Sequence, residues 1–405
     1  MLKENYAERE LTQRKMDKAE LRKYRAFGYS RFGPFLYGFV RWLKSELVRK
    51  GYKKVFFFSR DGYMMKKAFD IINDTDIVSK YVFFSRKSLR TPLLHRCADF
   101  EDSLKYLSRE RFISVGKLLE YYGFDEQQRQ RLAKGGGFSL DIDIPYDKLK
   151  DSALAKRIYT QYTEQINDFS RAQDDLLGRY LEQIGMNGRF AIVDIGWMGN
   201  MQYYLELYLQ SRAVRADIEG YYIGIERSAP VKSALNGYLY SPGDMSRKKQ
   251  VICFFGGYEK LLQSLEGSVS GYRQGINGVE PVLCPYEYAG SDAAQIVSAV
   301  RQWQQGALCF VQKAFRDGLK DSDEKLTMPL IRFGMYPSIE DTRLFSFFYN
   351  TDGTKVYYTA QKPLYRYKPK EFIHTLANSP WKTGFMKSAF KLPLPYHLVY
   401  KLLKK

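Results

Sequence analysis

Histidine and cysteine are scarce in this chain, and their placement restricts the chemistry that the sequence supports. The 405 residues include three histidines and four cysteines, none at the spacing of a C-x-x-C pair or a metal cluster. Their positions are His95, His374 and His397, and Cys97, Cys253, Cys284 and Cys309. This scatter argues against a zinc site, a disulfide framework and a Ser-His-Asp triad. We therefore expect a protein of the reducing cytoplasm.

Long apolar runs are also missing. No segment approaches the roughly 18 consecutive apolar residues of a membrane-spanning helix, and the charged first residues lack the apolar segment of a secretion signal. We expect neither an integral membrane protein nor cleaved export. With 45% apolar residues, a chain of this length is expected to build two or three globular domains.

The chain has fewer acidic than basic residues: 45 Asp and Glu compared with 64 Lys and Arg, which gives a net charge of +19. This excess favours anionic partners: nucleic acid, an anionic membrane surface or phosphorylated sugars. Nucleic acid is the least expected of them, because no helix-turn-helix, zinc-finger or RNA-binding motif accompanies the charge.

The last 25 residues, 381–405, contain six lysines and no acid. Five aromatic residues are interleaved with the lysines: Trp381, Phe385, Phe390, Tyr396 and Tyr400. Two interpretations stay open. The tail either makes a peripheral contact with the anionic inner face of a membrane, or forms a solvated helix whose aromatic side chains pack on the protein.

Four short apolar runs predict buried strands, at residues 55–58, 81–84, 190–193 and 221–225. Each of the first three ends on polar residues followed by a helical pattern or glycine, which is the rhythm of βα units. We predict an α/β protein with a mostly parallel, helix-covered sheet.

The remaining segments predict the organisation around this sheet. A helix is expected over 35–50, ending at Gly51, and helical stretches, notably 151–184, separate the second and third strands. Further on, we expect a helix over 291–314 and a hairpin over 343–360 with the four-residue loop 350–353. The resulting division is a charged N-terminal helix or arm (1–30), an α/β core (31–87 and 185–275), a helical cap insertion (88–184), a C-terminal α+β module (276–380) and the basic aromatic tail (381–405).

Polar residues follow three of the predicted strands, and parallel strands place such residues at one edge of the sheet. They are Ser59-Arg60-Asp61-Gly62, Ser85-Arg86-Lys87-Ser88 and Asp194-Ile195-Gly196-Trp197-Met198-Gly199. Asp61 and Asp194 are suited to share Mg²⁺. Ser85, Arg86 and the amides after Gly62 are suited to hold a phosphate. Gly196 and Gly199, which have no side chain, allow the phosphate to approach the backbone. The alternative is a set of turn and capping residues; the repetition on three strands favours function.

The order of these motifs resembles a divergent branch of the haloacid dehalogenase-like (HAD) superfamily found in bacterial surface-polysaccharide gene clusters. Two further stretches carry the resemblance, Phe32-Gly33-Pro34 with Trp42-Leu43, and LLQSLEGSVSGY at 261–272. It covers roughly residues 27 to 275. It implies a HAD-like, Rossmannoid sheet with a cap insertion and a C-terminal α+β module.

The resemblance also implies roles for individual residues. Ser59 occupies the place of the attacking Asp, Asp61 matches the acid–base Asp, Ser85 matches the second motif, and Asp194 matches the metal-binding motif. Trp197 and Met198 stand where a second acid is expected. We therefore expect Asp61, Ser59 and Arg60 as catalytic residues, with Asp61 and Asp194 as metal ligands. The basic residue of the third motif is not placed; Lys156, Arg157 and Arg171 lie in the stretch where it would fall.

Two functions follow from these expectations. The first is a HAD-like phosphohydrolase or a phosphoryl- or glycosyl-transfer protein that acts on phosphorylated or lipid-linked sugars in capsular or O-antigen polysaccharide biosynthesis. The second is a non-catalytic HAD-like module that binds a phosphorylated glycan or a glycosyltransferase partner. The carboxylates support the first function, and the missing nucleophile supports the second.

Overall fold

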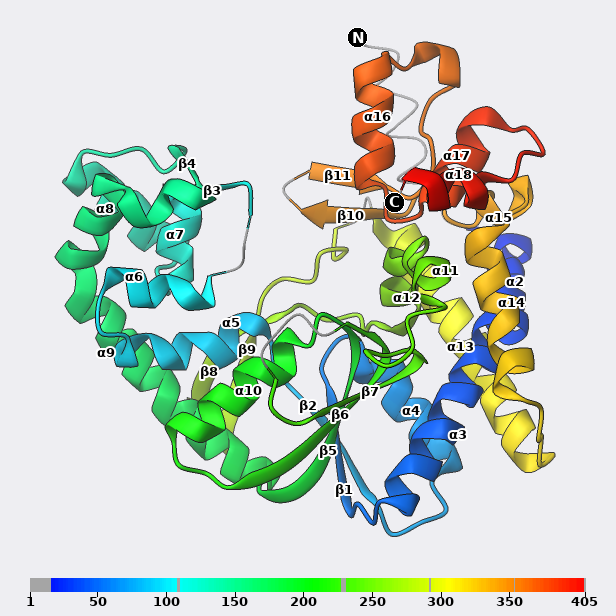
Figure 1. Ribbon diagram of the computed structural model, residues 1–405, viewed down its shortest axis with the longest axis horizontal. Coiled ribbons are helices and arrows are strands. Elements are labelled where there is room, and N and C mark those ends of the chain that lie inside the picture. The colour runs from blue at the N-terminus through cyan, green and yellow to red at the C-terminus, as the bar shows by residue number, and fades with distance from the viewer. Residues whose placement is uncertain (1–15, 108–109, 227–230, 291–292, 353, 404–405) are drawn as a thin grey trace.

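A five-stranded sheet organises the chain, in the order β2-β1-β5-β6-β7 with every neighbouring pair parallel (Figure 1). The computed structural model describes residues 16–107, 110–226, 231–290, 293–352 and 354–403. The strands are β1 Lys54–Phe58, β2 Val78–Val82, β5 Gly188–Trp197, β6 Ala216–Ile225 and β7 Ala234–Tyr240. The prediction of an α/β fold with a parallel sheet is confirmed. The second strand lies nearer the N-terminus than expected, and β7 was not predicted.

The sheet separates two hydrophobic cores, because successive side chains of a strand point to opposite faces. On β1, Val55 and Phe57 join one core, and Phe56 and Phe58 join the other. The first core is covered by α2 Lys18–Phe27, α3 Gly33–Arg49, α4 Gly62–Ile72, α13 Ala294–Arg316 and α14 Asp323–Met335. The second is covered by α5 Arg86–Arg90, α9 Ala153–Ile184 and α10 Asn200–Ser211. The layers therefore run helix, sheet, helix.

The strand order reverses beside β1. From β1 the chain moves outward to β2, and then returns to the other side of β1 to form β5, β6 and β7. In a doubly wound sheet, ligands bind outside the carboxyl ends of the strands at such a switch point. Residues 59–62 and 194–199 follow or end the two strands that flank it.

The segment between β2 and β5 is mainly helical. It contains α5, α6 Phe100–Ser103, α7 Val115–Tyr121, α8 Glu126–Gly136 and α9, and Figure 1 shows α6, α7 and α8 to one side of the sheet. An antiparallel ribbon of β3 Phe112–Ser114 and β4 Asp143–Pro145 was not predicted, because strands of three residues carry too little periodicity. The boundary expected at 88 falls inside α5, whereas the boundary at 184 coincides with the end of α9.

The charged helix or arm expected over 1–30 is a helix in its described part, but it packs on the protein and is not fully solvated. Residues 1–15 lie outside the described part of the chain, and α2 continues through a π-helical turn, Gly28–Phe32, into α3. Tyr24 and Phe27 are buried against Trp303 of α13. Two aromatic anchors on an otherwise charged helix make too weak an apolar stripe to be recognised in the sequence.

The C-terminal part packs into the two cores of the sheet instead of building a separate one: β8 and β9 join the second core, and most of the other elements join the first. Its further elements are α11 Lys248–Ile252, α12 Phe255–Leu262, β8 Val269–Gly275, β9 Gly278–Leu283, α15 Ile339–Arg343, β10 Tyr349–Asp352, β11 Thr354–Tyr357, α16 Pro369–Asn378, α17 Lys382–Phe390 and α18 Tyr396–Leu403. The boundary expected at 275 cuts the β8–β9 hairpin. The hairpin at 349–357 is present, but its four-residue loop is wrong, because Asn350 to Asp352 pair with β11.

The aromatic residues of the tail are largely enclosed by protein. Trp381 is buried among Phe254, Phe333 and Phe345, and its indole N–H donates to the Gly334 carbonyl at 2.8 Å. Phe385, Tyr396 and Tyr400 are buried and Phe390 is half-buried, so for these side chains the packing interpretation is the one observed. Across the described residues, no helix is both long enough and apolar enough to cross a bilayer.

Gly51 ends α3 as predicted and provides a first test of the fold. It has φ +71°, and the Gly51 and Tyr52 amides donate to the Val48 and Leu47 carbonyls in a Schellman motif. A methyl group added to Gly51 would have no neighbouring atom within 4 Å, so Gly51→Ala is expected to cost only the left-handed strain, about 1 kcal/mol of unfolding free energy. Urea titration measures it. Gly243→Ala is the control, being equally open without a left-handed backbone; an equal cost there contradicts the explanation.

Candidate functional site

A cavity of about 500 Å³ opens at the carboxyl edge of the sheet, beside the switch point. It brings together seven of the predicted site residues: Ser59, Arg60, Asp61, Ser85, Arg86, Asp194 and Gly196. They come from the ends of β1, β2 and β5, which is the convergence that the parallel topology predicts. Gly62 and Gly199 do not line the cavity; Gly62 begins α4 and Gly199 caps α10.

The turn after β1 is held in a strained backbone conformation. Arg60 has φ +69°, a region that side-chain-bearing residues rarely adopt. Its amide donates to the Tyr81 hydroxyl at 2.8 Å, and its carbonyl accepts from Ser264 at 3.0 Å and Tyr63 at 3.1 Å. Such strain persists only where surrounding contacts over-determine the geometry, and it is concentrated at functional sites.

Ser59 links the chain segments that follow the neighbouring strands β1 and β2 by hydrogen bonds. Its hydroxyl donates to the Phe84 carbonyl at 3.0 Å and accepts from the Phe84 amide at 3.2 Å. The side chain is buried, and its oxygen is already engaged as donor and acceptor. These hydrogen bonds give Ser59 a positioning role, and the catalytic role expected from the sequence stays a prediction.

The Ser85 hydroxyl is likewise engaged in hydrogen bonds within the protein. The hydroxyl caps α5 by accepting from the Ser88 amide at 3.0 Å and donates to the Val269 carbonyl at 2.6 Å. It thus fixes the cavity wall, and the neighbouring Arg86 is the more available phosphate ligand of the two.

Asp61 stands at the start of α4 but makes no capping hydrogen bond. The alternative interpretation of Asp61 as a helix cap is therefore not observed. Burial raises its pKa well above the ordinary value, and the charges of Asp194 and Glu259 raise the pKa further, against a lowering by Arg60 and Lys260. A carboxyl group in this environment keeps its proton closer to neutral pH, which suits it to general acid–base chemistry.

Asp194 lies one residue before the end of the buried part of β5 and is 9% exposed. Burial raises its pKa to about 6, with a further increase from Glu259 and a decrease from Arg86 and a hydrogen bond of the Ile195 backbone. Two carboxyl groups with raised pKa values thus face one cavity.

The three cations of the cavity are held differently. Arg60 and Lys260 donate to the same oxygen of Glu287, at 3.2 and 2.9 Å. Lys260 is buried, and burial lowers its pKa while Glu287 raises it. Arg86, in contrast, is exposed at the rim, and in the described part of the chain no hydrogen bond or ion pair engages its guanidinium.

Glu259, Lys260 and Glu287 line the cavity but were missed from the sequence. Glu259 accepts from the Trp197 indole N–H at 3.1 Å, and burial raises its pKa. A signal existed, since Glu259 and Lys260 are an adjacent charged pair inside the otherwise apolar helix α12, and buried charges are rare without a specific role.

The end of β5 also has an unusual backbone. Gly196, Trp197 and Gly199 have φ of +106°, +66° and +73°. A methyl group on Gly196 would lie 2.4 Å from the Gly224 carbonyl oxygen, so glycine is required there by both conformation and space. The bend directs Trp197 toward Glu259 and places its indole parallel to the Tyr240 ring, with 6.4 Å between centroids.

The basic residues considered for the third motif do not reach the cavity. Lys156, Arg157 and Arg171 are exposed on α9, and Arg171 pairs with Asp168 at 3.3 Å. Lys260, which comes from α12 later in the chain, is the buried cation of this site.

A metal site is limited to two carboxylates. Among the described residues, no group of three His, Cys, Asp or Glu side chains is arranged to hold a metal. Mg²⁺ binds through one or two carboxylates with several waters and substrate oxygens, and Asp61 and Asp194 match that donor set. The charge of Asp194 raises the pKa of Asp61, a repulsion that a divalent cation between the two groups would relieve.

We compared the chain with known proteins. No protein-family model matches it, and no curated protein sequence is significantly similar to it. We therefore infer its function from the residues of the site.

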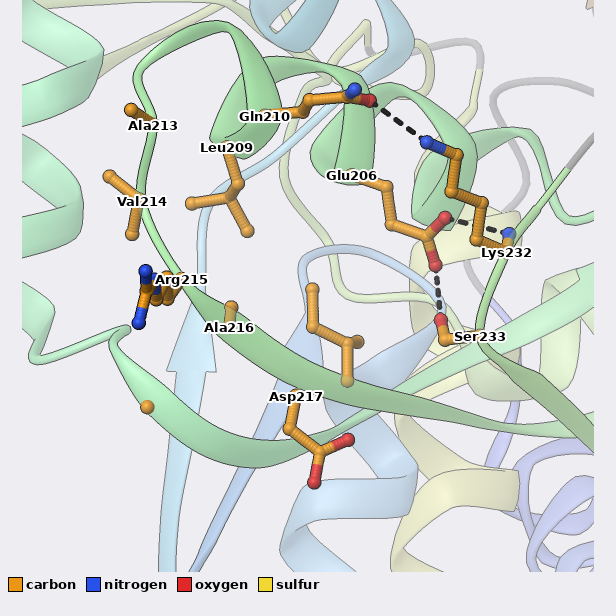
Figure 2. A pocket seen from close by; sticks show the side chains of 12 residues that line it. Glu206, Leu209, Gln210, Ala213, Val214, Arg215, Ala216, Asp217, Lys232 and Ser233 are labelled. Carbon is orange, nitrogen blue, oxygen red and sulfur yellow. Dashed lines mark hydrogen bonds between the residues drawn. The ribbon is translucent and has the colours of Figure 1, made fainter.

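A larger cavity, about 720 Å³, lies at the opposite end of the sheet, where β5 and β6 begin (Figure 2). None of the sequence-predicted site residues lines it. Its polar groups mainly bond to one another: Glu206 accepts from the Lys232 amide at 3.0 Å and from the Ser233 hydroxyl, and the Lys232 ammonium donates to Gln210 at 3.3 Å. We favour the smaller cavity as the functional site because it gathers carboxyl groups with raised pKa values and an exposed arginine at the switch point.

Proposed function

We propose that this protein is a HAD-like enzyme that hydrolyses or transfers the phosphate or phospho-linked group of a phosphorylated or lipid-linked sugar. The observation that carries the proposal is the convergence of Asp61, Asp194 and Glu259, with raised pKa values, on one cavity beside Arg60 and Arg86. The resemblance of its motifs to the surface-polysaccharide branch of the HAD superfamily supports the sugar class and a role in capsular or O-antigen biosynthesis.

The proposed reaction proceeds without a covalent aspartyl intermediate, because position 59 carries a serine whose hydroxyl is bonded to Phe84. Asp61 serves as the general base that accepts the proton of the attacking water or sugar hydroxyl, and the leaving oxygen takes its proton from solvent. Arg60 and Arg86 stabilise the negative charge of the phosphate. Mg²⁺ bound by Asp61 and Asp194 would add charge neutralisation.

The second candidate function is binding without catalysis, in which the same cavity holds a phosphorylated glycan or presents it to a glycosyltransferase. The engaged hydroxyl of Ser59 favours this candidate, since it leaves the cavity without an evident nucleophile.

A turnover screen separates the two candidates. Purified protein is offered p-nitrophenyl phosphate, sugar 1-phosphates, sugar 6-phosphates and nucleotide sugars, with Mg²⁺ and with EDTA, and phosphate release and product formation are measured. Mg²⁺-dependent turnover of a phosphosugar supports the enzyme. Binding by calorimetry without turnover of any substrate overturns it in favour of the binding module.

Arg86→Ala tests the phosphate contact. Because the guanidinium is exposed at the rim and has no hydrogen-bond partner among the described residues, its loss is expected to weaken binding of a sugar phosphate about tenfold, as one charge-assisted hydrogen bond would. We expect no loss of thermal stability. Calorimetric titration measures the affinity. Lys87→Ala is the matched control, since it removes the same charge from a residue that does not line the cavity and lies 4.0 Å from Glu120. Equal loss in both variants would mean that only net charge matters.

A further inference from the structure

The C-terminal helical hairpin, α17 and α18, has two chemically different faces. Its inner face is anchored in the protein by Trp381, Phe385, Tyr396 and Tyr400, all buried. Residues 391–395, the turn between the helices, are exposed throughout. The hairpin is therefore a fixed element with an open outer side.

Aliphatic side chains occupy that outer side. Leu392, Leu394, Leu398 and Val399 are between 41% and 51% exposed. On α18, Leu398 lies opposite the buried pair Tyr396 and Tyr400, whereas Val399, three residues after Tyr396, lies at the flank of the buried face and is still 41% exposed. Isolated exposed apolar residues need no explanation, but a cluster on one short hairpin marks an interaction surface.

Lysines flank these aliphatic residues. Lys391 is exposed at the end of α17, and Lys387 of α17 and Lys401 of α18 are half-buried; the Lys387 ammonium donates to the Leu392 carbonyl at 3.1 Å. We call Lys387, Lys391, Lys401 and the four aliphatic residues the basic apolar face. It lies within residues 361–405, which contain ten Lys and Arg and a single Glu.

We propose that the basic apolar face docks the protein onto an anionic lipid bilayer. Exposed aliphatic side chains beside lysines match the interface of such a bilayer, where the apolar groups enter the headgroup region and the ammonium groups meet lipid phosphates. A second copy of the chain is a poor occupant, because a symmetric contact would bring the two lysine sets together. The membrane contact is made by leucine and valine and not by the aromatic residues that the sequence suggested, since those are buried.

The basic apolar face is connected to the functional cavity through the C-terminal hairpin β10–β11. The Ala360 amide donates to Ser388 of α17 at 2.8 Å, and the hydroxyl of the nearby Tyr358 donates to Asn350 at 3.1 Å. Asn350 lines the cavity. Docking would thus fix the cavity relative to the bilayer, an arrangement suited to a lipid-linked substrate, although the membrane contact itself rests on the surface alone and not on the proposed reaction.

Vesicle flotation tests the docking. The full chain is mixed with vesicles of equal phosphatidylglycerol and phosphatidylcholine, or of phosphatidylcholine alone, at low and high salt. We expect binding to the anionic vesicles, at least tenfold weaker binding to the neutral ones, and release by salt. Equal binding to both vesicles, or no binding to either, would overturn the proposal.

Two double variants assign the contact to this face. Leu394→Ser with Leu398→Ser is expected to reduce anionic-vesicle binding at least tenfold without changing thermal unfolding, because both side chains are exposed. The control, Val48→Ser with Val78→Ser, removes aliphatic groups that are 54% and 51% exposed elsewhere, and should bind as wild type. An equal loss of binding in the control would contradict the assignment. A dimer that is detected by sedimentation and disappears only in the Leu394 and Leu398 variant would also contradict it, because the face would then bind a second copy of the chain.

Discussion

Asp61→Asn is expected to lower phosphosugar turnover at least a hundredfold while leaving the fold intact. The amide keeps the size of the carboxyl group but cannot accept a proton, and general acid–base catalysis contributes about 10²–10⁴ in rate. Asp61 makes no capping hydrogen bond whose loss would unfold α4. Steady-state kinetics on the substrate found by the screen measures the effect, and circular dichroism checks the fold.

Ser59→Ala is the informative comparison for that experiment. If the only role of Ser59 is to hold β1 to Phe84 by hydrogen bonds, the alanine variant loses stability but keeps turnover within about a tenfold range. Leaving one buried hydrogen-bonding group without its partner costs about 1–3 kcal/mol of unfolding free energy. A loss as large as that of Asp61→Asn would instead make Ser59 the attacking group. Unchanged turnover in Asp61→Asn would remove Asp61 from the mechanism.

The sheet and the position of its site were predictable because both follow from local patterns. The runs 55–58 and 190–193 are apolar at every position, which is required of strands buried on both faces, and they are indeed divided between the two cores. Their carboxyl ends must then meet at one edge, so Asp61, Arg86 and Asp194 could be grouped from the sequence alone.

Other residues of the site could not be predicted, because long-range packing brings them to the cavity. Lys260 and Glu287 reach the cavity from separate C-terminal segments, and no sequence periodicity links them to Arg60, although one ion-paired cluster joins all three. The hydrogen bonds of Ser59 could not be predicted for a related reason: the partner of its hydroxyl, the backbone of Phe84, becomes a neighbour only when β1 and β2 pair. β7 escaped recognition because its Asn and Gly interrupt the apolar run.

Asp194→Asn is expected to stabilise the protein by as much as about 3 kcal/mol above pH 7, and by almost nothing near pH 4. The pKa of Asp194 is about 6 in the folded chain and about 3.9 when unfolded. The group therefore favours folding fully only below about pH 4, and this contribution is lost as the pH rises through about 6. Two pKa units correspond to about 3 kcal/mol. Urea titrations at the two pH values, in EDTA, measure the difference.

Asp76→Asn is the matched control for this pH dependence. Asp76 is exposed, and its hydrogen bond and ion pair with Lys53 lower its pKa, so its contribution to folding has the opposite sign. Both variants raise the positive charge of a chain that already carries +19, and added self-repulsion alone would destabilise each of them. Stabilisation of Asp194→Asn alone, growing between about pH 4 and 7, therefore isolates the cost of holding that carboxylate in the cavity. Stabilisation of Asp194→Asn that is equal at both pH values would contradict the raised pKa of Asp194. It would also contradict the inference that the cavity favours binding of a proton or a cation.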